Sequence, residues 1–114
     1  MSDRPKILVV CGSSKERSRT AEHIFKNDNR FHIRSVGLSP QSERQIKDVD
    51  VDWSDLIMVM EDDQSDRINT SFKHLDLPFV EVLHIADEYA YLDKELMMML
   101  TDRINSILDI EFDI

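Results

Sequence analysis

Short apolar runs alternate with amphipathic segments along the chain, and this alternation limits the possible folds more than any other feature. The apolar runs have the length of buried strands, and they are Ile7 to Val10, Phe31 to Val36, Leu56 to Met60 and Phe79 to Leu83. Apolar spacing predicts helices over 19–27, 43–47, 65–72 and 93–109. Strands that alternate with helices form parallel sheets through right-handed crossovers. We therefore predict an α/β fold of three layers around a doubly wound, four-stranded parallel sheet of order 2-1-3-4, of the flavodoxin-like kind.

The composition fits one domain spanning residues 1–114. The chain has two glycines and three prolines, so we expect no flexible linker. Its 23 acidic and 14 basic side chains give a formal net charge of -9, which argues against general binding to nucleic acid or to an anionic membrane. No apolar run approaches the roughly 20 residues that span a bilayer, and the first residues are charged where a signal peptide would be apolar. We expect a cytoplasmic protein and leave its oligomeric state open.

The chain contains a single cysteine, Cys11. One cysteine excludes an internal disulfide and a cysteine-rich zinc cluster. The four histidines show no metal-ligand spacing, so we expect neither a metal nor another cofactor. The roles left for Cys11 are packing as a small apolar side chain and reactivity as a thiolate.

The first predicted strand runs directly into the segment 11–18, after which a helix is expected to begin. At such a junction backbone N–H groups point inward, and the helix macrodipole adds roughly half a positive charge. A phosphate or a similar oxyanion fits a nest of this kind. We predict that seven residues bind it, namely Gly12, Ser13, Ser14, Lys15, Glu16, Arg17 and Ser18.

Three side chains of this segment suit reaction chemistry. The helix dipole and the Arg17 guanidinium are expected to depress the pKa of Cys11 from about 8.5, which favours the nucleophilic thiolate. Arg17 offers a planar fork that matches two phosphate oxygens. Ser18 is placed to donate a hydrogen bond to the thiolate. The alternatives are a buried, inert thiol for Cys11 and a solvated residue at the start of a helix for Arg17.

A cysteine followed, after five residues, by an arginine is the signature of cysteine-dependent phosphatases. Here it follows an apolar strand near the start of the chain, and in this the chain resembles the low-molecular-weight protein tyrosine phosphatase family, most closely a short branch of it. The family motif Cys-x5-Arg-Ser-x-Thr-Ala-Glu is matched by Cys11, Arg17, Ser18, Thr20, Ala21 and Glu22. Further similarity covers Ser35-Val36-Gly37 and the stretch 53–61. The chain departs from the family at Ser14, Glu16 and Arg19, where asparagine, often a second cysteine, and proline are usual.

The resemblance implies a phosphatase-like domain that hydrolyses phosphotyrosine or small aryl phosphates through a cysteinyl-phosphate intermediate. Cys11 is then the nucleophile, and Arg17 holds the phosphate oxygens. The family's general acid lies in an Asp-Pro dipeptide, which this chain lacks. The nearest equivalent is Asp87, which follows the fourth predicted strand and so shares the carboxyl edge of the sheet with Cys11.

Other carboxylates compete with Asp87 for the role of general acid. Glu88 is its neighbour, and Asp62 and Asp63 follow the third predicted strand, so all of them open on the same edge. An N-cap is the simpler role for Asp87. Tyr89 and Tyr91 are predicted to wall the entrance and to stack on an aromatic leaving group.

A protein that kept the loop and lost the general acid would bind a phosphate or a phosphoprotein without turnover. The missing Asp-Pro dipeptide and Ser14 favour this alternative. A phosphocarrier is a third possibility, because related sugar-transport subunits also hold a cysteine after their first strand. Arg17 argues against it, since those loops lack the arginine.

Overall fold

The computed structural model describes residues 4–12 and 16–114. Four parallel strands form one sheet in the order β2-β1-β3-β4. The strands are β1 (Lys6–Cys11), β2 (His32–Gly37), β3 (Leu56–Val59) and β4 (Phe79–Val82). The predicted α/β fold and the predicted strand order are therefore confirmed. Each strand lies within one residue of its apolar run in the sequence.

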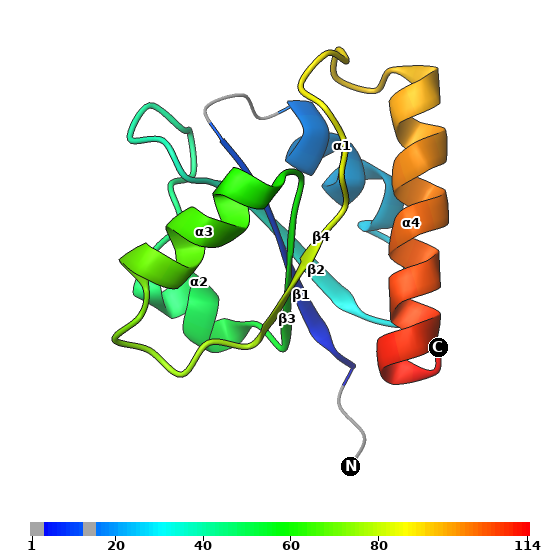
Figure 1. Cartoon of the computed structure of the whole chain (residues 1–114). Coiled ribbons are helices and arrows are strands. Elements are labelled where there is room, and N and C mark those ends of the chain that lie inside the picture. The colour runs from blue at the N-terminus through cyan, green and yellow to red at the C-terminus, as the bar shows by residue number, and fades with distance from the viewer. Residues whose placement is uncertain (1–3, 13–15) are drawn as a thin grey trace.

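The helices cover both faces of this sheet, as Figure 1 shows. They are α1 (Glu16–Phe25), α2 (Asp48–Trp53), α3 (Asp62–Ser71) and α4 (Lys94–Phe112). The first and last helices, α1 and α4, pack together on one face, while α2 and α3 cover the other. Within the described residues, no helix has both the length and the apolar character needed to cross a membrane.

One predicted helix is wrong. The segment 43–47 forms turns and a short bridge between Gly37 and Gln45, and the helix begins only at Asp48. The sequence from Asp48 to Trp53 alternates acidic and apolar residues, a period of two that does not indicate a helix. A local hydrogen bond starts it instead, because the Asp50 carboxylate accepts from the backbone N–H of Lys47 at 2.9 Å.

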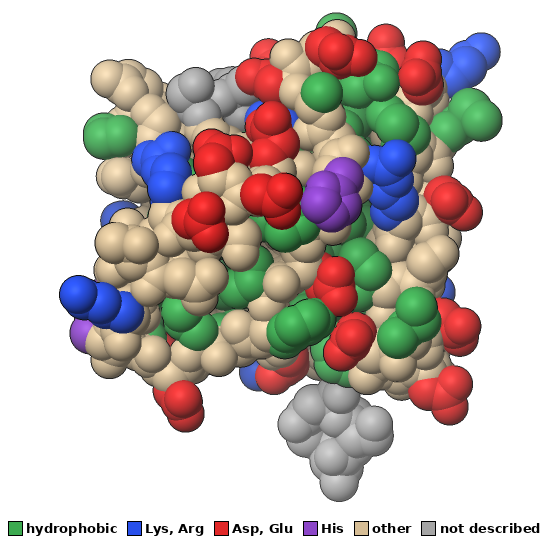
Figure 2. Space-filling model, viewed as in Figure 1, with side chains coloured by type: hydrophobic (Ala, Val, Ile, Leu, Met, Phe, Trp, Pro, Cys, Tyr) green, Lys and Arg blue, Asp and Glu red, His purple; other side chains and the backbone are tan. Residues whose placement is uncertain are grey.

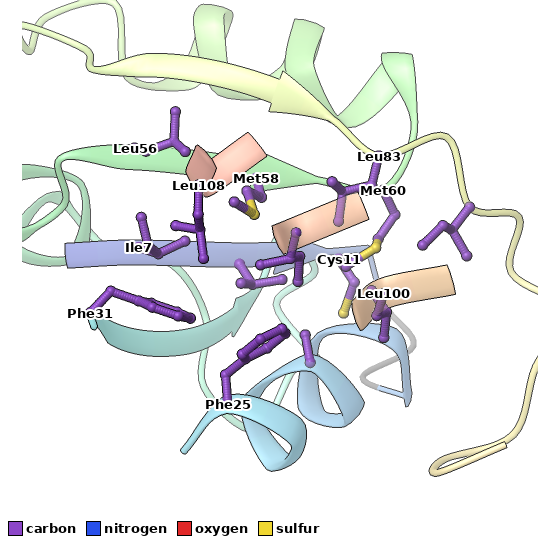
Figure 3. Packing of buried hydrophobic residues seen from close by; sticks show 14 of the residues in the cluster. Ile7, Cys11, Phe25, Phe31, Leu56, Met58, Met60, Leu83, Leu100 and Leu108 are labelled. Atoms are coloured by element: carbon purple, nitrogen blue, oxygen red, sulfur yellow. The ribbon is translucent and has the colours of Figure 1, made fainter. Parts of the chain in front are cut away.

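Alternation along β1 divides the core into two clusters. Ile7, Val9 and Cys11 point toward α1 and α4, whereas Leu8 and Val10 point toward α2 and α3. All five side chains are at most 1% exposed. Figure 3 shows the first cluster, with Cys11 near Leu100, Met60 and Leu83. The sulfur of Cys11 therefore belongs to the hydrophobic core as well as to the end of a strand.

Gly37 ends β2 in a space that admits no side chain. A Cβ atom there would lie 2.1 Å from Ser42 Oγ, 2.7 Å from Ser42 Cβ and 3.1 Å from the Gly12 carbonyl oxygen. The close approach lets the segment after β2 fold against the end of β1, where the N–H of Leu38 donates to the Cys11 carbonyl at 2.9 Å. Gly37 thus fixes one wall beside Cys11.

We expect Gly37→Ala to destabilise the fold by about 1–3 kcal/mol, the usual cost of forcing a group into a packed site. Urea unfolding of the two proteins measures the difference. Ser42→Gly is the matched background, because it removes the two closest atoms. In that background the alanine should cost clearly less, and an equal cost in both backgrounds would contradict the steric explanation.

Candidate functional site

The carboxyl ends of the strands meet at one edge of the sheet, at the top of Figure 1. Four connections begin there, and three of them bear on the site: the segment from Cys11 to α1, the turn from β3 into α3, and the longer segment from β4 to α4. Because the strands are parallel, residues that are far apart in sequence come together at this edge. The candidate site consists of side chains from the end of β1, the first turn of α1, the turn after β3 and the segment after β4.

Cys11 is 1% exposed, and its Sγ lies 2.9 Å from Ser18 Oγ. The predicted pairing of these two residues is therefore present. Burial raises the pKa of the Cys11 thiol, and although the Ser18 hydrogen bond and the Arg17 charge lower this pKa, burial prevails. The prediction of a depressed pKa is therefore wrong, because the sulfur lies in an apolar cluster that penalises the charged form.

Arg17 lies in the first turn of α1 with only 2% of its side chain exposed. Its Nη1 donates to the Glu61 carboxylate at 2.9 Å and to the Ile85 carbonyl oxygen at 2.7 Å. Its Nε has no hydrogen-bond partner among the described residues. A solvated role for Arg17 at the start of a helix is therefore wrong. Buried N–H groups are rarely left without a hydrogen bond, so the free Nε indicates a binding position for a hydrogen-bond acceptor such as an anion oxygen.

Asp87 is brought to the same place from the segment after β4. Its carboxylate lies 3.8 Å from Arg17 Nε. The negative charge of Asp87 also contributes to the raised pKa of the Cys11 thiol. Half of the Asp87 side chain is exposed, so it also reaches solvent. The competing carboxylates Asp62, Asp63 and Glu88 are exposed at the same edge. Of the four candidates, Asp87 is the one with a contact to Arg17 in the described part of the chain.

The segment that carries Asp87 is held at both of its ends. His84 and Leu92 have left-handed backbone conformations, with φ of 58° and 64°, which are uncommon for residues other than glycine. At one end Arg103 of α4 donates to the carbonyl oxygens of Leu83 and His84. At the other, the N–H of Leu92 donates to Thr20 Oγ1 at 3.0 Å. Hydrogen bonds from α1 and α4 therefore hold the two ends of this segment in place.

The two tyrosines predicted to wall the entrance, Tyr89 and Tyr91, contact different parts of the protein. The Tyr89 hydroxyl donates to Glu95 at 3.3 Å, and its ring packs partly against the core cluster of Cys11. Tyr91 lies beside α1, with the Arg19 guanidinium 5.3 Å from the centre of its ring. Arg19 therefore forms a cation–π contact. Whether either tyrosine contacts a substrate stays a prediction.

Of the remaining predicted phosphate-binding residues, the structure describes Gly12 and Glu16. Gly12 follows Cys11 directly, and Glu16 is already the first residue of α1, so the helix begins earlier than expected. Ser13, Ser14 and Lys15 lie outside the described residues. Binding of an anion by this segment stays a prediction.

Sequence reasoning missed two residues that shape the site. In the sequence two further acids, Asp62 and Asp63, follow Glu61, a pattern typical of a solvated surface, yet Glu61 binds Arg17. Its position directly after the apolar run that ends at Met60 is the available signal. Gln64 is buried, and its side-chain oxygen accepts from the backbone N–H groups of Met60 and Glu61 at 2.8 and 3.2 Å. A glutamine five residues after the end of a strand carries no such signal by itself.

Metal ions in proteins are usually bound by clusters of His, Cys, Asp and Glu side chains. Residues 4–12 and 16–114 contain no group of three or more such side chains suited to hold a metal ion.

Comparisons with known proteins agree on the fold. SP-PTP, a low molecular weight protein tyrosine phosphatase from Streptococcus pyogenes, is 17% identical with a TM-score of 0.77, over 95% of this chain and 93% of its own. The YwlE arginine phosphatase from Geobacillus stearothermophilus is 20% identical with a TM-score of 0.71, over 94% of both chains. The low molecular weight protein tyrosine phosphatase from Campylobacter jejuni is 17% identical with a TM-score of 0.64, over 93% and 94%. No protein-family model matches the sequence, and no curated protein does. The fold predicted from the resemblance is thus confirmed.

We expect the Cys11 thiol to titrate above the ordinary cysteine value of about 8.5, because burial disfavours the thiolate. The thiolate forms only as the pH rises through the elevated pKa, and Ser18→Ala should raise that pKa further by removing a stabilising hydrogen bond. Ultraviolet thiolate absorbance measures this directly, since the chain has one cysteine. Cys11→Ser supplies the blank. A midpoint below about 8.5 in the ligand-free protein would contradict a pKa raised by burial.

Proposed function

We propose that the protein is a cysteine-dependent phosphatase that hydrolyses phosphotyrosine or small aryl phosphates. The observation that carries the proposal is the buried Arg17 with an unsatisfied Nε, on the same helix turn as the Ser18 hydroxyl that contacts Cys11. A cation, a nucleophile and a carboxylate converge at the edge where this class of sheet binds its ligands. The shared fold with two tyrosine phosphatases and an arginine phosphatase supports the same reading.

In the proposed reaction Cys11 sulfur attacks phosphorus in line, forming an S–P bond as the P–O bond to the leaving group breaks. Asp87 gives its proton to the departing oxygen, so that a neutral phenol leaves. A water molecule then attacks the cysteinyl phosphate with the Asp87 carboxylate as base. Inorganic phosphate and the original thiolate result, and the carboxyl proton is restored.

Arg17 stabilises the charge that spreads over the phosphoryl oxygens. Its Nε is the unsatisfied donor, whereas its Nη1 is held by Glu61 and by the Ile85 carbonyl oxygen. These two contacts fix the plane of the guanidinium before a ligand arrives, which is the condition for electrostatic preorganisation. Glu61 is thus a positioning residue in the proposed mechanism.

A protonated thiol in the ligand-free protein is compatible with this mechanism. A thiol beside a phosphate dianion holds as many protons as a thiolate beside the monoanion. Because the second pKa of a phosphate monoester is about 6, the substrate is a dianion at neutral pH and has an open position for the proton of Cys11. The thiol has the higher pKa, so this transfer is uphill and adds to the barrier of the reaction. The positive charge of Arg17 favours the thiolate that remains.

We assign the activity to the cytoplasm, because a lone nucleophilic cysteine keeps its reduced form best in a reducing compartment. The second candidate is a module that binds a phosphate or a phosphoprotein without turnover. The raised pKa of Cys11 favours this second candidate, since a neutral thiol is a poor nucleophile. Turnover of an aryl phosphate separates the two.

Cys11→Ser should abolish hydrolysis of p-nitrophenyl phosphate while leaving phosphate binding within a few-fold, because the hydroxyl is a far weaker nucleophile and the anion-binding groups remain. Release of p-nitrophenol and calorimetric phosphate titration measure the two properties. Residual turnover in the variant would indicate another nucleophile. Phosphate binding without turnover in the native protein would support the binding module.

Asp87→Asn should slow hydrolysis of phenyl phosphate by about 10²- to 10⁴-fold, the usual contribution of a general acid. The loss should be smaller for p-nitrophenyl phosphate, whose leaving group needs less protonation. Glu88→Gln is the matched variant, because it removes a neighbouring carboxylate from the same segment. Equal losses for both substrates, or a larger loss in Glu88→Gln, would assign the acid elsewhere.

A further inference from the structure

Carboxylates surround the candidate anion site. They belong to the turn after β3 and to the segment after β4, and we name them the acidic rim: Glu61, Asp62, Asp63, Asp87 and Glu88. Figure 2 shows acidic side chains gathered on the face where α3 begins and where the segment after β4 runs. Glu61 and Asp87 touch Arg17 and are 42% and 49% exposed, so their charges face both the site and the solvent.

Nearby carboxylates extend this negative field beyond Asp87. The pKa of the Tyr89 hydroxyl is raised by loss of water contact and by the charges of Glu95, Glu88 and Asp93. The charges of these three carboxylates therefore reach the Tyr89 side chain, two positions after Asp87. A ligand that approaches the site passes through their combined potential.

Three described cations at this edge are already engaged by neighbouring groups. Arg17 is buried and lies next to two rim carboxylates, and Arg19 lies over the ring of Tyr91. Arg103 donates to two backbone carbonyls at the end of β4. The five carboxylates of the rim therefore outnumber these three cations, whose guanidinium groups are already in contact with other parts of the protein.

The unsatisfied Nε of Arg17 nevertheless points to an anionic ligand. The Arg17 side chain is only 2% exposed. Its Nε lies 3.8 Å from the Asp87 carboxylate, without a hydrogen bond. When a phosphorylated side chain binds this donor, the residues next to it in the substrate lie close to the carboxylates of the acidic rim. At physiological salt, charges act over about 8 Å, so the residues that flank a phosphorylated side chain are affected.

We propose that the site selects phosphoryl groups carried in basic segments of proteins, with Lys and Arg side chains flanking the phosphorylated residue and pairing with the acidic rim. This rests on the proposed phosphatase function and names the substrate class of that site. Cationic flanks offset the repulsion between the phosphate and the rim, whereas acidic flanks add to it. Charge, rather than a side-chain pocket, sets the preference.

Two phosphotyrosyl peptides of equal length, one flanked by lysines and one by glutamates, test the proposal. We expect kcat/KM to favour the lysine-flanked peptide by roughly tenfold or more at low salt, within the range of electrostatic steering. The ratio should shrink as salt is added. A ratio near one, or a preference for the glutamate-flanked peptide, would overturn the proposal.

Asp62→Asn combined with Asp63→Asn is the variant that tests the rim. Both side chains are exposed in the first turn of α3. The ratio between the two peptides should fall at least threefold toward one, and any common effect on chemistry cancels in that ratio. Asp102→Asn with Asp109→Asn on the exposed side of α4 removes the same charge elsewhere. An equal fall in this control would show that net charge alone acts, against a local rim.

Failure of the proposed function is recognised separately. If p-nitrophenyl phosphate and both peptides resist hydrolysis, the phosphatase assignment fails, and the same peptides are titrated into the Cys11→Ser protein. Tighter binding of the lysine-flanked peptide would then support selection by the rim without catalysis. Turnover of p-nitrophenyl phosphate together with no turnover of either peptide would overturn the substrate class alone.

Discussion

The burial of Arg17 is the constraint on which the rest of the site depends. A guanidinium is always charged, and removing it from water is costly unless its hydrogen bonds and charge are met. Two separate parts of the chain provide that compensation, the turn after β3 through Glu61 and the segment after β4 through the Ile85 carbonyl oxygen. The parallel sheet brings both to the end of β1, so α1 can begin with a buried cation.

The same balance accounts for the state of Cys11. With Glu61 and Asp87 beside Arg17, a thiolate would add a third negative charge to one positive charge in a largely apolar place. Burial therefore keeps the thiol neutral until a ligand changes the balance. In the proposed mechanism a phosphate brings two negative charges, takes the free donor of Arg17 and accepts the thiol proton. Charge at the site is thus redistributed within the complex.

Much of this architecture follows from local patterns in the sequence. Apolar runs and helical spacing predicted the sheet and its order, and the parallel arrangement placed Cys11 and Asp87 at one edge. The prediction of a depressed pKa failed because it weighed the helix dipole and Arg17 without the apolar cluster that α4 contributes around Cys11. The helix at 48–53 was missed because a capping hydrogen bond, rather than periodicity, starts it. Glu61 was missed because it looked like one acid among several.

The position of Asp87 shows why long-range contacts limit such predictions. Its segment bends at His84 and Leu92, two residues in an unfavourable backbone conformation. Arg103 from the last helix holds one bend, and Thr20 from the first helix holds the other. Thr20 is recognisable in the sequence as part of a motif, yet its hydrogen bond to Leu92 spans 72 positions. The general-acid candidate is therefore positioned by α1 and α4 together, through hydrogen bonds at both ends of its segment.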